Sequence, residues 1–115
     1  MGEYGFPKEN RLLKRRDFQR VYRQGRLLQD RYFRLFYLER PGPPRLGLTV
    51  SRRWGKAVAR NRAKRVIREA FRLNKHLFKN LDLIVQPRRA ALELSKGELR
   101  ERFLKAVARL PHRTG

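Results

Sequence analysis

One segment of the chain, residues 56–72, carries seven basic residues and one acid in seventeen positions and still keeps the spacing of an amphipathic helix. Its apolar residues recur at intervals of three and four, which places them on one helical face. These apolar positions are Ala59, Ala63, Val66, Ala70 and, just beyond the segment, Leu73. A fold that contains this helix, called the basic helix below, must offer a second layer for that face to cover.

The other faces of the basic helix are crowded with like charges. Basic residues four apart destabilise an isolated helix by about 0.2–0.5 kcal/mol per pair, and Glu69 is the only acid that relieves this repulsion. A solvated charged face and a face that binds a polyanion are the two interpretations, and the shortage of acids favours the second. The basic positions are Arg60, Arg62, Lys64, Arg65, Arg68 and Arg72.

Composition supports a polyanionic partner. The chain has 31 basic and 10 acidic residues among 115, for a net charge of +21. Such a charge repels itself unless a partner neutralises it. Arginines outnumber lysines 23 to 8, and the planar guanidinium suits phosphate and stacks on bases. Nucleic acid is therefore the predicted partner, and RNA is favoured because aromatic residues accompany the charge.

Several other classes are disfavoured. An anionic membrane surface would also attract this charge, but no segment approaches the roughly 20 apolar residues needed to span a bilayer. The first residues contain no apolar run of a signal peptide, so we expect a cytoplasmic protein with no membrane partner. The chain lacks cysteine, and His76 and His112 have no ligand-like spacing. The acids are too scattered for a two-metal nuclease site, so we expect no catalytic residue, metal or cofactor on the protein.

The pattern of elements predicts a small two-layer α/β sandwich formed by residues 1–115 as one domain, with residues 1–10 as a flexible arm. Ser95 and Glu98 match a capping box at the start of the last helix. The predicted elements are a helix over 13–24, strands over 31–39 and 45–51, the basic helix to about residue 74, a strand over 81–86 and a helix after Ser95.

Alternation along strand 31–39 puts Tyr32, Arg34 and Phe36 on the face opposite Phe33, Leu35 and Tyr37. If Phe18 and Tyr22 of the first helix line the same groove, an aromatic and basic trough results. Such a trough suits single-stranded nucleic acid, because bases stack on aromatic rings and cations follow the backbone. The alternative is that Phe18 and Tyr22 are ordinary core residues beneath the sheet, and periodicity leaves both interpretations open.

These segments resemble the protein subunit of bacterial ribonuclease P over nearly the whole chain. The strongest likeness is SRRWGKAVARNRAKRVIREAF, residues 51–71, which contains that family's Arg-Asn-Arg motif at Arg60, Asn61 and Arg62. It follows directly on the strand LGLTVS. The segments LKRRDFQRVYRQG, RYFRLFYLE and RLGLTVS fit the family in order and spacing.

The resemblance implies an α-β-β-β-α-β-α fold with a four-stranded sheet, whose extra strand would fall near residues 27–29. It also implies a left-handed β-α-β crossover through the basic helix. Spacing alone would have predicted the right-handed crossover that roughly 98% of such units adopt.

The function implied by the resemblance is that of an RNA-binding subunit, which assists a catalytic RNA in the endonucleolytic removal of the 5′ leader from precursor tRNA. The RNA and its magnesium ions would perform the hydrolysis, the isolated protein would be inactive, and one protein would pair with one RNA. From the residues alone, a small basic ribosomal protein is the alternative.

The resemblance also implies two groups of binding residues. Those expected to contact the catalytic RNA are Arg52, Arg53, Lys56, Arg60, Asn61, Arg62, Lys64, Arg65 and Arg68. Those expected to contact the single-stranded leader are Phe18, Tyr22, Arg34 and Phe36.

Overall fold

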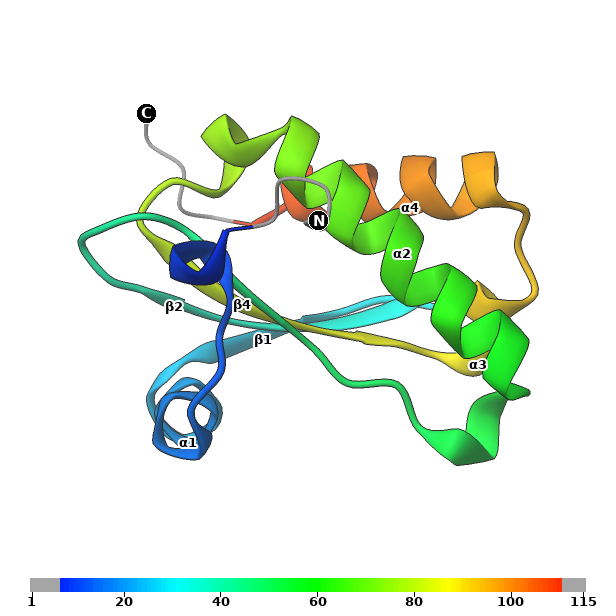
Figure 1. Ribbon diagram of the computed structural model, residues 1–115, viewed down its shortest axis with the longest axis horizontal. Helices are drawn as coiled ribbons and strands as arrows, with labels where there is room; N and C mark the ends of the chain where they lie inside the picture. Colours follow the sequence, from blue (N-terminus) through cyan, green and yellow to red (C-terminus); the bar gives the residue numbers. More distant parts are fainter. Residues whose placement is uncertain (1–6, 111–115) are drawn as a thin grey trace.

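A computed structural model describes residues 7–110 of the chain. Helices α2 and α4 lie side by side on one face of a four-stranded sheet, and α1 crosses the other face near one end (Figure 1). The helices are α1 (Arg15–Gln24), α2 (Ala57–Leu73), α3 (Arg89–Leu92) and α4 (Lys96–Ala108). The strands are β1 (Arg26–Gln29), β2 (Phe33–Glu39), β3 (Arg45–Leu48) and β4 (Leu81–Pro87). The described residues also form the short 3-10 helices η2 (Lys8–Asn10), η3 (Arg52–Trp54) and η4 (Lys75–Phe78).

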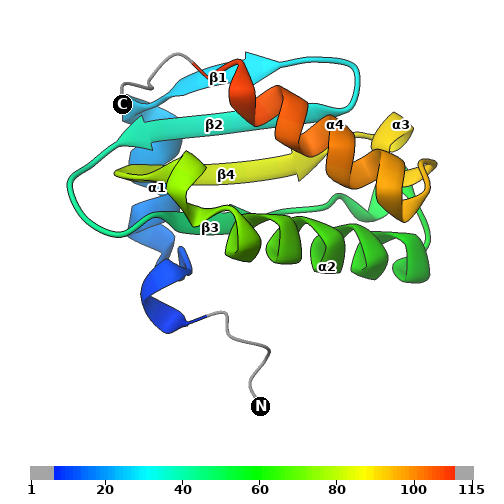
Figure 2. The ribbon, with the colours of Figure 1, turned by 90° about the horizontal axis from the view of Figure 1, so that it is seen from above.

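The strand order is β1-β2-β4-β3, so the last strand of the sequence lies inside the sheet. β2 pairs antiparallel with β1 and with β4, whereas β3 pairs parallel with β4. In Figure 2, α2 lies in front of the sheet, β3 and β4 both run to the right, and β4 lies above β3. This arrangement is a left-handed β3-α2-β4 crossover. It confirms the expectation from the resemblance, and the right-handed crossover that spacing alone would have predicted is wrong here.

The basic helix forms as predicted, but its buried stripe differs from the predicted one. Ala63, Val66 and Ala70 are buried, whereas Leu73 is 59% exposed. Ile67 and Phe71, which were not in the predicted stripe, are fully buried. The helical period of 3.6 residues explains this, because 63, 66, 67, 70 and 71 fall on one arc and position 73 has rotated out of it.

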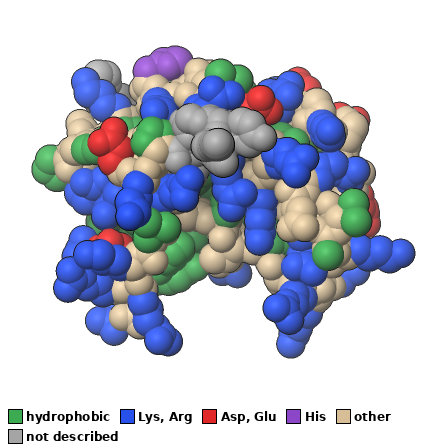
Figure 3. Space-filling model, in the orientation of Figure 1, with side chains coloured by type: hydrophobic (Ala, Val, Ile, Leu, Met, Phe, Trp, Pro, Cys, Tyr) green, Lys and Arg blue, Asp and Glu red, His purple; other side chains and the backbone are tan. Residues whose placement is uncertain are grey.

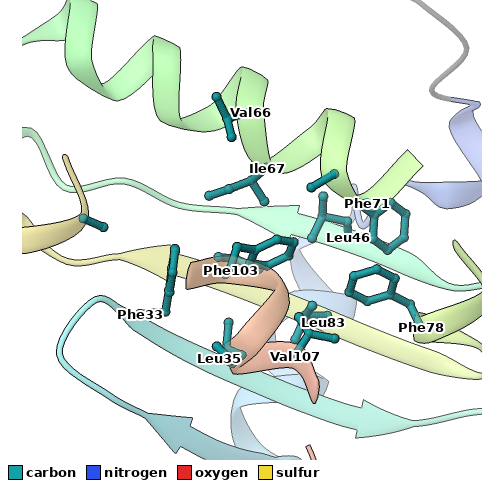
Figure 4. Close-up of a cluster of buried hydrophobic side chains, with 14 of the residues drawn as sticks. Phe33, Leu35, Leu46, Val66, Ile67, Phe71, Phe78, Leu83, Phe103 and Val107 are labelled. Atoms are coloured by element: carbon teal, nitrogen blue, oxygen red, sulfur yellow. The ribbon is translucent and has the colours of Figure 1, made fainter. Parts of the chain in front are cut away.

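The main core lies between the sheet and the α2–α4 layer (Figure 4). The rings of Phe33 and Phe103 approach edge to face with centroids 5.8 Å apart. Phe71 and Phe78 lie 4.6 Å apart by the same measure. Such aromatic pairs add to the free energy gained by removing the rings from water, and they fix α2 and α4 on the sheet.

The predicted capping box of the last helix is confirmed. The Ser95 hydroxyl accepts a hydrogen bond from the Glu98 N–H at 3.2 Å, and the Glu98 carboxylate accepts one from the Ser95 N–H at 3.0 Å. These two bonds satisfy backbone donors that the first helical turn leaves unpaired. The helix then buries Leu99, Phe103 and Val107 against the core.

Tyr32 is on the wrong face in the prediction from strand alternation. β2 begins only at Phe33, because the Asp30 carboxylate accepts hydrogen bonds from the N–H groups of Tyr32 and Phe33 and holds a turn there. Tyr32 therefore packs against the main core, with the Arg102 guanidinium of α4 over its ring at 5.1 Å. Arg34 and Phe36 keep the predicted face.

Part of the predicted flexible arm, residues 8–10, is ordered instead. Residues 1–6 of the arm lie outside the described part of the chain, but Lys8–Asn10 forms η2 and Asn10 is only 2% exposed. The Asn10 amide donates to the Pro44 carbonyl at 2.8 Å, and its oxygen accepts from Lys75 at 3.0 Å. A buried amide with both ends satisfied anchors this segment beside β3.

Candidate nucleic-acid interface

A cleft of about 1000 Å³ opens where α2 passes the edge of β3, and we call it the basic cleft. One wall is the basic side of α2, and the other is formed by the segment before α1, Phe18 and β3. Its lining residues are Arg11, Leu12, Leu13, Phe18, Leu46, Gly47, Leu48, Asn61, Lys64, Arg65, Arg68, Glu69 and Arg72.

The charge of the basic cleft is poorly compensated by protein carboxylates. Glu69 is the only acid among the described residues of its lining, and its carboxylate lies 3.9 Å from the Arg72 guanidinium. Partial burial, followed by the nearby charge of Arg11, lowers the pKa of the Arg68 guanidinium below its ordinary value. Desolvation and a like charge both disfavour a cation. An anion that enters the cleft relieves both costs.

The structure divides the residues expected to contact the catalytic RNA. Asn61, Lys64, Arg65 and Arg68 line the basic cleft together. The others lie elsewhere: Arg52 and Arg53 are exposed in η3, Lys56 is exposed at the N-cap of α2, Arg62 is half-buried outside the cleft, and Arg60 is half-buried.

Arg60 has an internal role. Its Nε donates to the Gly55 carbonyl at 3.2 Å, which ties α2 to the turn that carries η3. Arg89 of α3 supports the same turn by donating to the Arg53 carbonyl at 3.3 Å. The first arginine of the Arg-Asn-Arg motif therefore helps to hold Arg52 and Arg53 in place.

Two basic residues that line the cleft, Arg11 and Arg72, were not among those expected to contact the catalytic RNA. Arg72 continues the basic row of α2 at intervals of four, and that signal was available in the sequence. Arg11 belongs to the segment next to the predicted arm. Its bridge to Leu46 of β3 brings it to the cleft, and no local pattern predicts that pairing.

The aromatic residues of the predicted trough lie on the α1 face of the sheet, the face that α1 and η3 flank in Figure 1. Figure 3, in the same orientation, shows two lobes rich in Lys and Arg at the lower edge, with the surface hollowed between them. Tyr22 meets Phe36 edge to face at 4.9 Å. The Arg34 guanidinium lies 5.3 Å from the centroid of the same Phe36 ring.

Both interpretations of the α1 aromatics hold in part. Tyr22 is 41% exposed and faces the trough. Phe18 and Phe36 are half-buried and pack on a second small core of Leu12, Val21 and Ile84. Phe18 also lines the basic cleft, so this ring touches both candidate binding regions rather than the trough alone.

A glycine makes the position of Phe18 possible. A Cβ atom at Gly47 of β3 would lie 2.7 Å from Cε1 and Cζ of the Phe18 ring. Any side chain at this position would therefore displace the ring from the sheet. The Phe18 ring thus fills the space above Gly47 on this face of the sheet.

The start of α1 is held to the sheet by what we call the carboxylate network: Asp17, Asp82, Arg40 and Arg45. Arg45 donates to both oxygens of the fully buried Asp82 carboxylate, at 2.8 and 2.7 Å. Arg40 adds a bond to Asp82 at 2.9 Å, and Arg45 reaches Asp17 of α1 at 3.4 Å. The hydrogen bonds to Asp82 raise the pKa of the Arg45 guanidinium above its ordinary value.

Residues 7–110 contain no group of three or more His, Asp or Glu side chains placed to hold a metal ion. Within the same range, no helix combines the length and apolar character required to cross a bilayer.

Comparison with known proteins identifies the family. Residues 6–111 match the family described as Ribonuclease P. The ribonuclease P protein component of Desulforapulum autotrophicum is 41% identical over 117 aligned residues that span both chains completely. A mutant RNase P protein of Staphylococcus aureus, described as defective in mRNA degradation activity, has 33% identity and a TM-score of 0.80 over 86% of each chain.

The RNase P protein of Thermotoga maritima has 35% identity and a TM-score of 0.78, covering 89% of this chain and 98% of that one. These matches overturn the alternative of a ribosomal protein. The fold, the Arg-Asn-Arg helix and the basic cleft agree with them, and the chain belongs to the family of ribonuclease P protein components, the RNA-binding subunits of a tRNA-processing ribonucleoprotein.

Proposed function

We propose that this chain binds the catalytic RNA of ribonuclease P through its basic cleft and the single-stranded 5′ leader of precursor tRNA through its aromatic trough. The observation that carries the proposal is the basic cleft, where Lys64, Arg65 and Arg68 of α2 face Arg11 and where Glu69 is the single acid within residues 7–110. Phosphates supply the negative charge that this arrangement lacks, and arginine forks bind them with two parallel hydrogen bonds.

The trough contributes a different kind of binding. Tyr22 exposes its ring beside Phe36, and a base that stacks on such a ring gains about 1–3 kcal/mol whatever its identity. A subunit that must accept many different leaders benefits from this tolerance. Arg52 and Arg53, exposed on η3, are placed to meet phosphates at the opposite rim.

The hydrolysis itself belongs, in this proposal, to the RNA with its bound magnesium ions. The residues of the basic cleft do not fit a divalent cation, because one carboxylate and one amide stand among five basic side chains. Magnesium prefers oxygen ligands and would be repelled there. The protein therefore orients the two RNAs and lowers their mutual repulsion, one protein to one catalytic RNA. The expected cytoplasmic location stays a prediction.

Reconstituted cleavage tests the function directly. The purified protein alone should not cleave precursor tRNA. Added to a bacterial ribonuclease P RNA at low magnesium, it should restore removal of the 5′ leader. If it fails to stimulate several such RNAs, the proposed function is wrong.

A binding comparison tests the assignment of the two regions. Phe36→Ala should weaken binding of precursor tRNA to the holoenzyme and leave binding of mature tRNA unchanged. Arg65→Ala should instead weaken assembly with the catalytic RNA. Phe18→Ala should affect both, since its ring lies in both regions. Identical behaviour of Phe36→Ala and Arg65→Ala would contradict the division.

A further inference from the structure

The floor of the aromatic trough is ordered in rows that run across the strands. The register places Leu27 of β1 beside Phe36 of β2, and Phe36 beside Ile84 of β4, as an apolar row. Two residues further along, Gln29 lies beside Arg34, and Arg34 lies beside Gln86. We call Gln29, Arg34 and Gln86 the polar row. All three share the α1 face of the sheet, because strand residues two apart point the same way.

Helix α1 covers the inner part of the apolar row, Phe36 and Ile84, whereas Leu27 at its outer end is 44% exposed, and α1 leaves the polar row open. Val21 of α1 packs on Ile84, and Phe18 lies against Gly47. Tyr22 is the α1 side chain that reaches the polar row, where its hydroxyl accepts a hydrogen bond from the Gln86 amide at 3.2 Å. The carboxyl end of β4, where Gln86 lies, points away from α1 toward η3 (Figure 1). The polar row therefore forms the open part of the trough floor.

Arg34 differs from the arginines of the carboxylate network because it pairs with no acid in the described part of the chain. Arg40 and Arg45 both bond to Asp82, whereas the Arg34 guanidinium rests over the Phe36 ring. Its Nε is buried and has no hydrogen-bond partner among the described residues. A half-buried cation without a carboxylate is costly, and a ligand that accepts hydrogen bonds from its fork would relieve that cost.

Gln86 complements this donor with an acceptor. Its amide nitrogen is engaged with Tyr22, so the Tyr22 ring and the Gln86 side chain hold each other in place. Gln86 is the cross-strand partner of Arg34, so the two side chains leave the same face of the sheet from neighbouring strands. A guanidinium donor and an amide acceptor therefore share the part of the sheet face that also carries the Tyr22 and Phe36 rings.

The position of the fork favours a base edge over a phosphate. Phosphates of a bound strand remain near water and near the exposed arginines of the rim, Arg52 and Arg53. Bases turn toward the aromatic floor. Among the four bases, guanine presents two adjacent acceptors, O6 and N7, that match a guanidinium fork. This inference rests on the proposed function of the trough as the leader site. Within it, we propose that Arg34, supported by Gln86, selects guanine at one position of the 5′ leader.

The test uses the reconstituted holoenzyme and a set of precursor tRNAs in which each leader position carries each base in turn. We expect guanine to be preferred at one position by about tenfold in affinity, the discrimination typical of one good two-bond contact to a base. Arg34→Met removes the fork and should reduce the preference to about twofold or less. Replacing that guanine by 7-deazaguanine, which lacks the N7 acceptor, should reduce the preference with the unaltered protein.

Arg102→Met is the matched control, because Arg102 also lies over an aromatic ring, at 5.1 Å from Tyr32, but on the opposite face of the sheet. It should keep the full guanine preference. The proposal is overturned if no leader position prefers guanine, if 7-deazaguanine binds as well as guanine, or if Arg34→Met weakens all leaders equally. In those cases the proposed function still stands as long as precursor tRNA binds more tightly than mature tRNA.

Discussion

Two arginine-rich regions of this molecule use the same side chain in opposite ways. In the carboxylate network, Arg40 and Arg45 are bonded to Asp82, and Arg45 reaches Asp17 as well. In the basic cleft, Arg65, Arg68 and Arg72 share Glu69 as the one acid in its lining. The pKa of the guanidinium is raised in Arg45 and lowered in Arg68.

The difference shows that the supply of carboxylates, rather than the number of arginines, separates structural charge from binding charge in this chain. Where acids are buried nearby, arginine fixes α1 to the sheet. Where few acids lie nearby, the arginines create a positive potential that a phosphate backbone can neutralise. Substitutions in the two regions should therefore have opposite consequences for folding and for binding.

The largest expected effect concerns stability. Arg45→Met leaves the buried Asp82 with Arg40 as its remaining partner. Breaking a buried ion pair from one side typically costs about 3–5 kcal/mol, and we expect a loss of that size in the free energy of unfolding measured with urea. Arg65→Met is the control and should cost little, because Arg65 lines an open cleft. Equal losses of stability in both variants would contradict the distinction between the carboxylate network and the basic cleft.

The next effect concerns RNA binding. Arg65→Gln should weaken binding of the catalytic RNA by about tenfold or more, since a hydrogen bond to a charged group contributes roughly 1.5–3 kcal/mol. The slope of log affinity against log salt should become shallower by about 0.7–0.9 for each phosphate that the variant no longer neutralises. Tyr22→Ala should leave that slope unchanged. A slope unaffected by Arg65→Gln would mean that this residue does not bind phosphate.

A smaller effect tests the ring that joins the two regions. Gly47→Ala places a methyl group 2.7 Å from the Phe18 ring and should displace it. Overpacking of this kind costs about 1–3 kcal/mol of stability. Thermal unfolding would measure that cost, and binding assays should show weaker affinity for both the leader and the catalytic RNA. Full affinity for both would show that Phe18 is only a core residue.

The smallest expected effect is a gain in affinity for the catalytic RNA. Glu69→Gln removes the single acid of the basic cleft, and because this side chain is half exposed the change should be worth only about 0.2–1 kcal/mol. We expect about twofold tighter binding of the catalytic RNA at low salt, fading as salt is added. Glu101→Gln on α4 is the control, because Glu101 pairs with Lys105 and neither residue lines the cleft. It should not change the affinity for the catalytic RNA. Weaker binding by Glu69→Gln would show that the acid orients Arg72 for RNA.

Much of the fold was predictable because its determinants are local. The helical period of residues 56–72, the capping box at Ser95 and the alternation after Phe33 each express physics that acts within a few residues. One kind of error occurred where distant segments decide the outcome. Asn10 is buried because Pro44 and Lys75, both far away in the sequence, meet it. The error at Tyr32 is of another kind, because it comes from a local turn held by Asp30, only two residues earlier.

The candidate site was predictable in its chemistry and less so in its geometry. Asn61, Lys64, Arg65 and Arg68 could be placed on one side of a helix from their spacing. The periodicity of α1 could not show that Phe18 enters the same cleft, because that position depends on Gly47, nearly thirty residues away. The crossover hand came from resemblance alone.

The interior position of β4 has a consequence for how the chain is made. β3 does not pair with β2, so the first three strands cannot form the sheet until β4 lies between them. β4 also carries Asp82, the carboxylate on which Arg40 and Arg45 converge. During synthesis, a chain shorter than about eighty residues has neither its central strand nor the acid that neutralises those arginines. Folding is therefore delayed until late in translation. A nascent chain with this positive charge meets the surrounding RNA molecules before it has a folded structure that can distinguish one RNA from another.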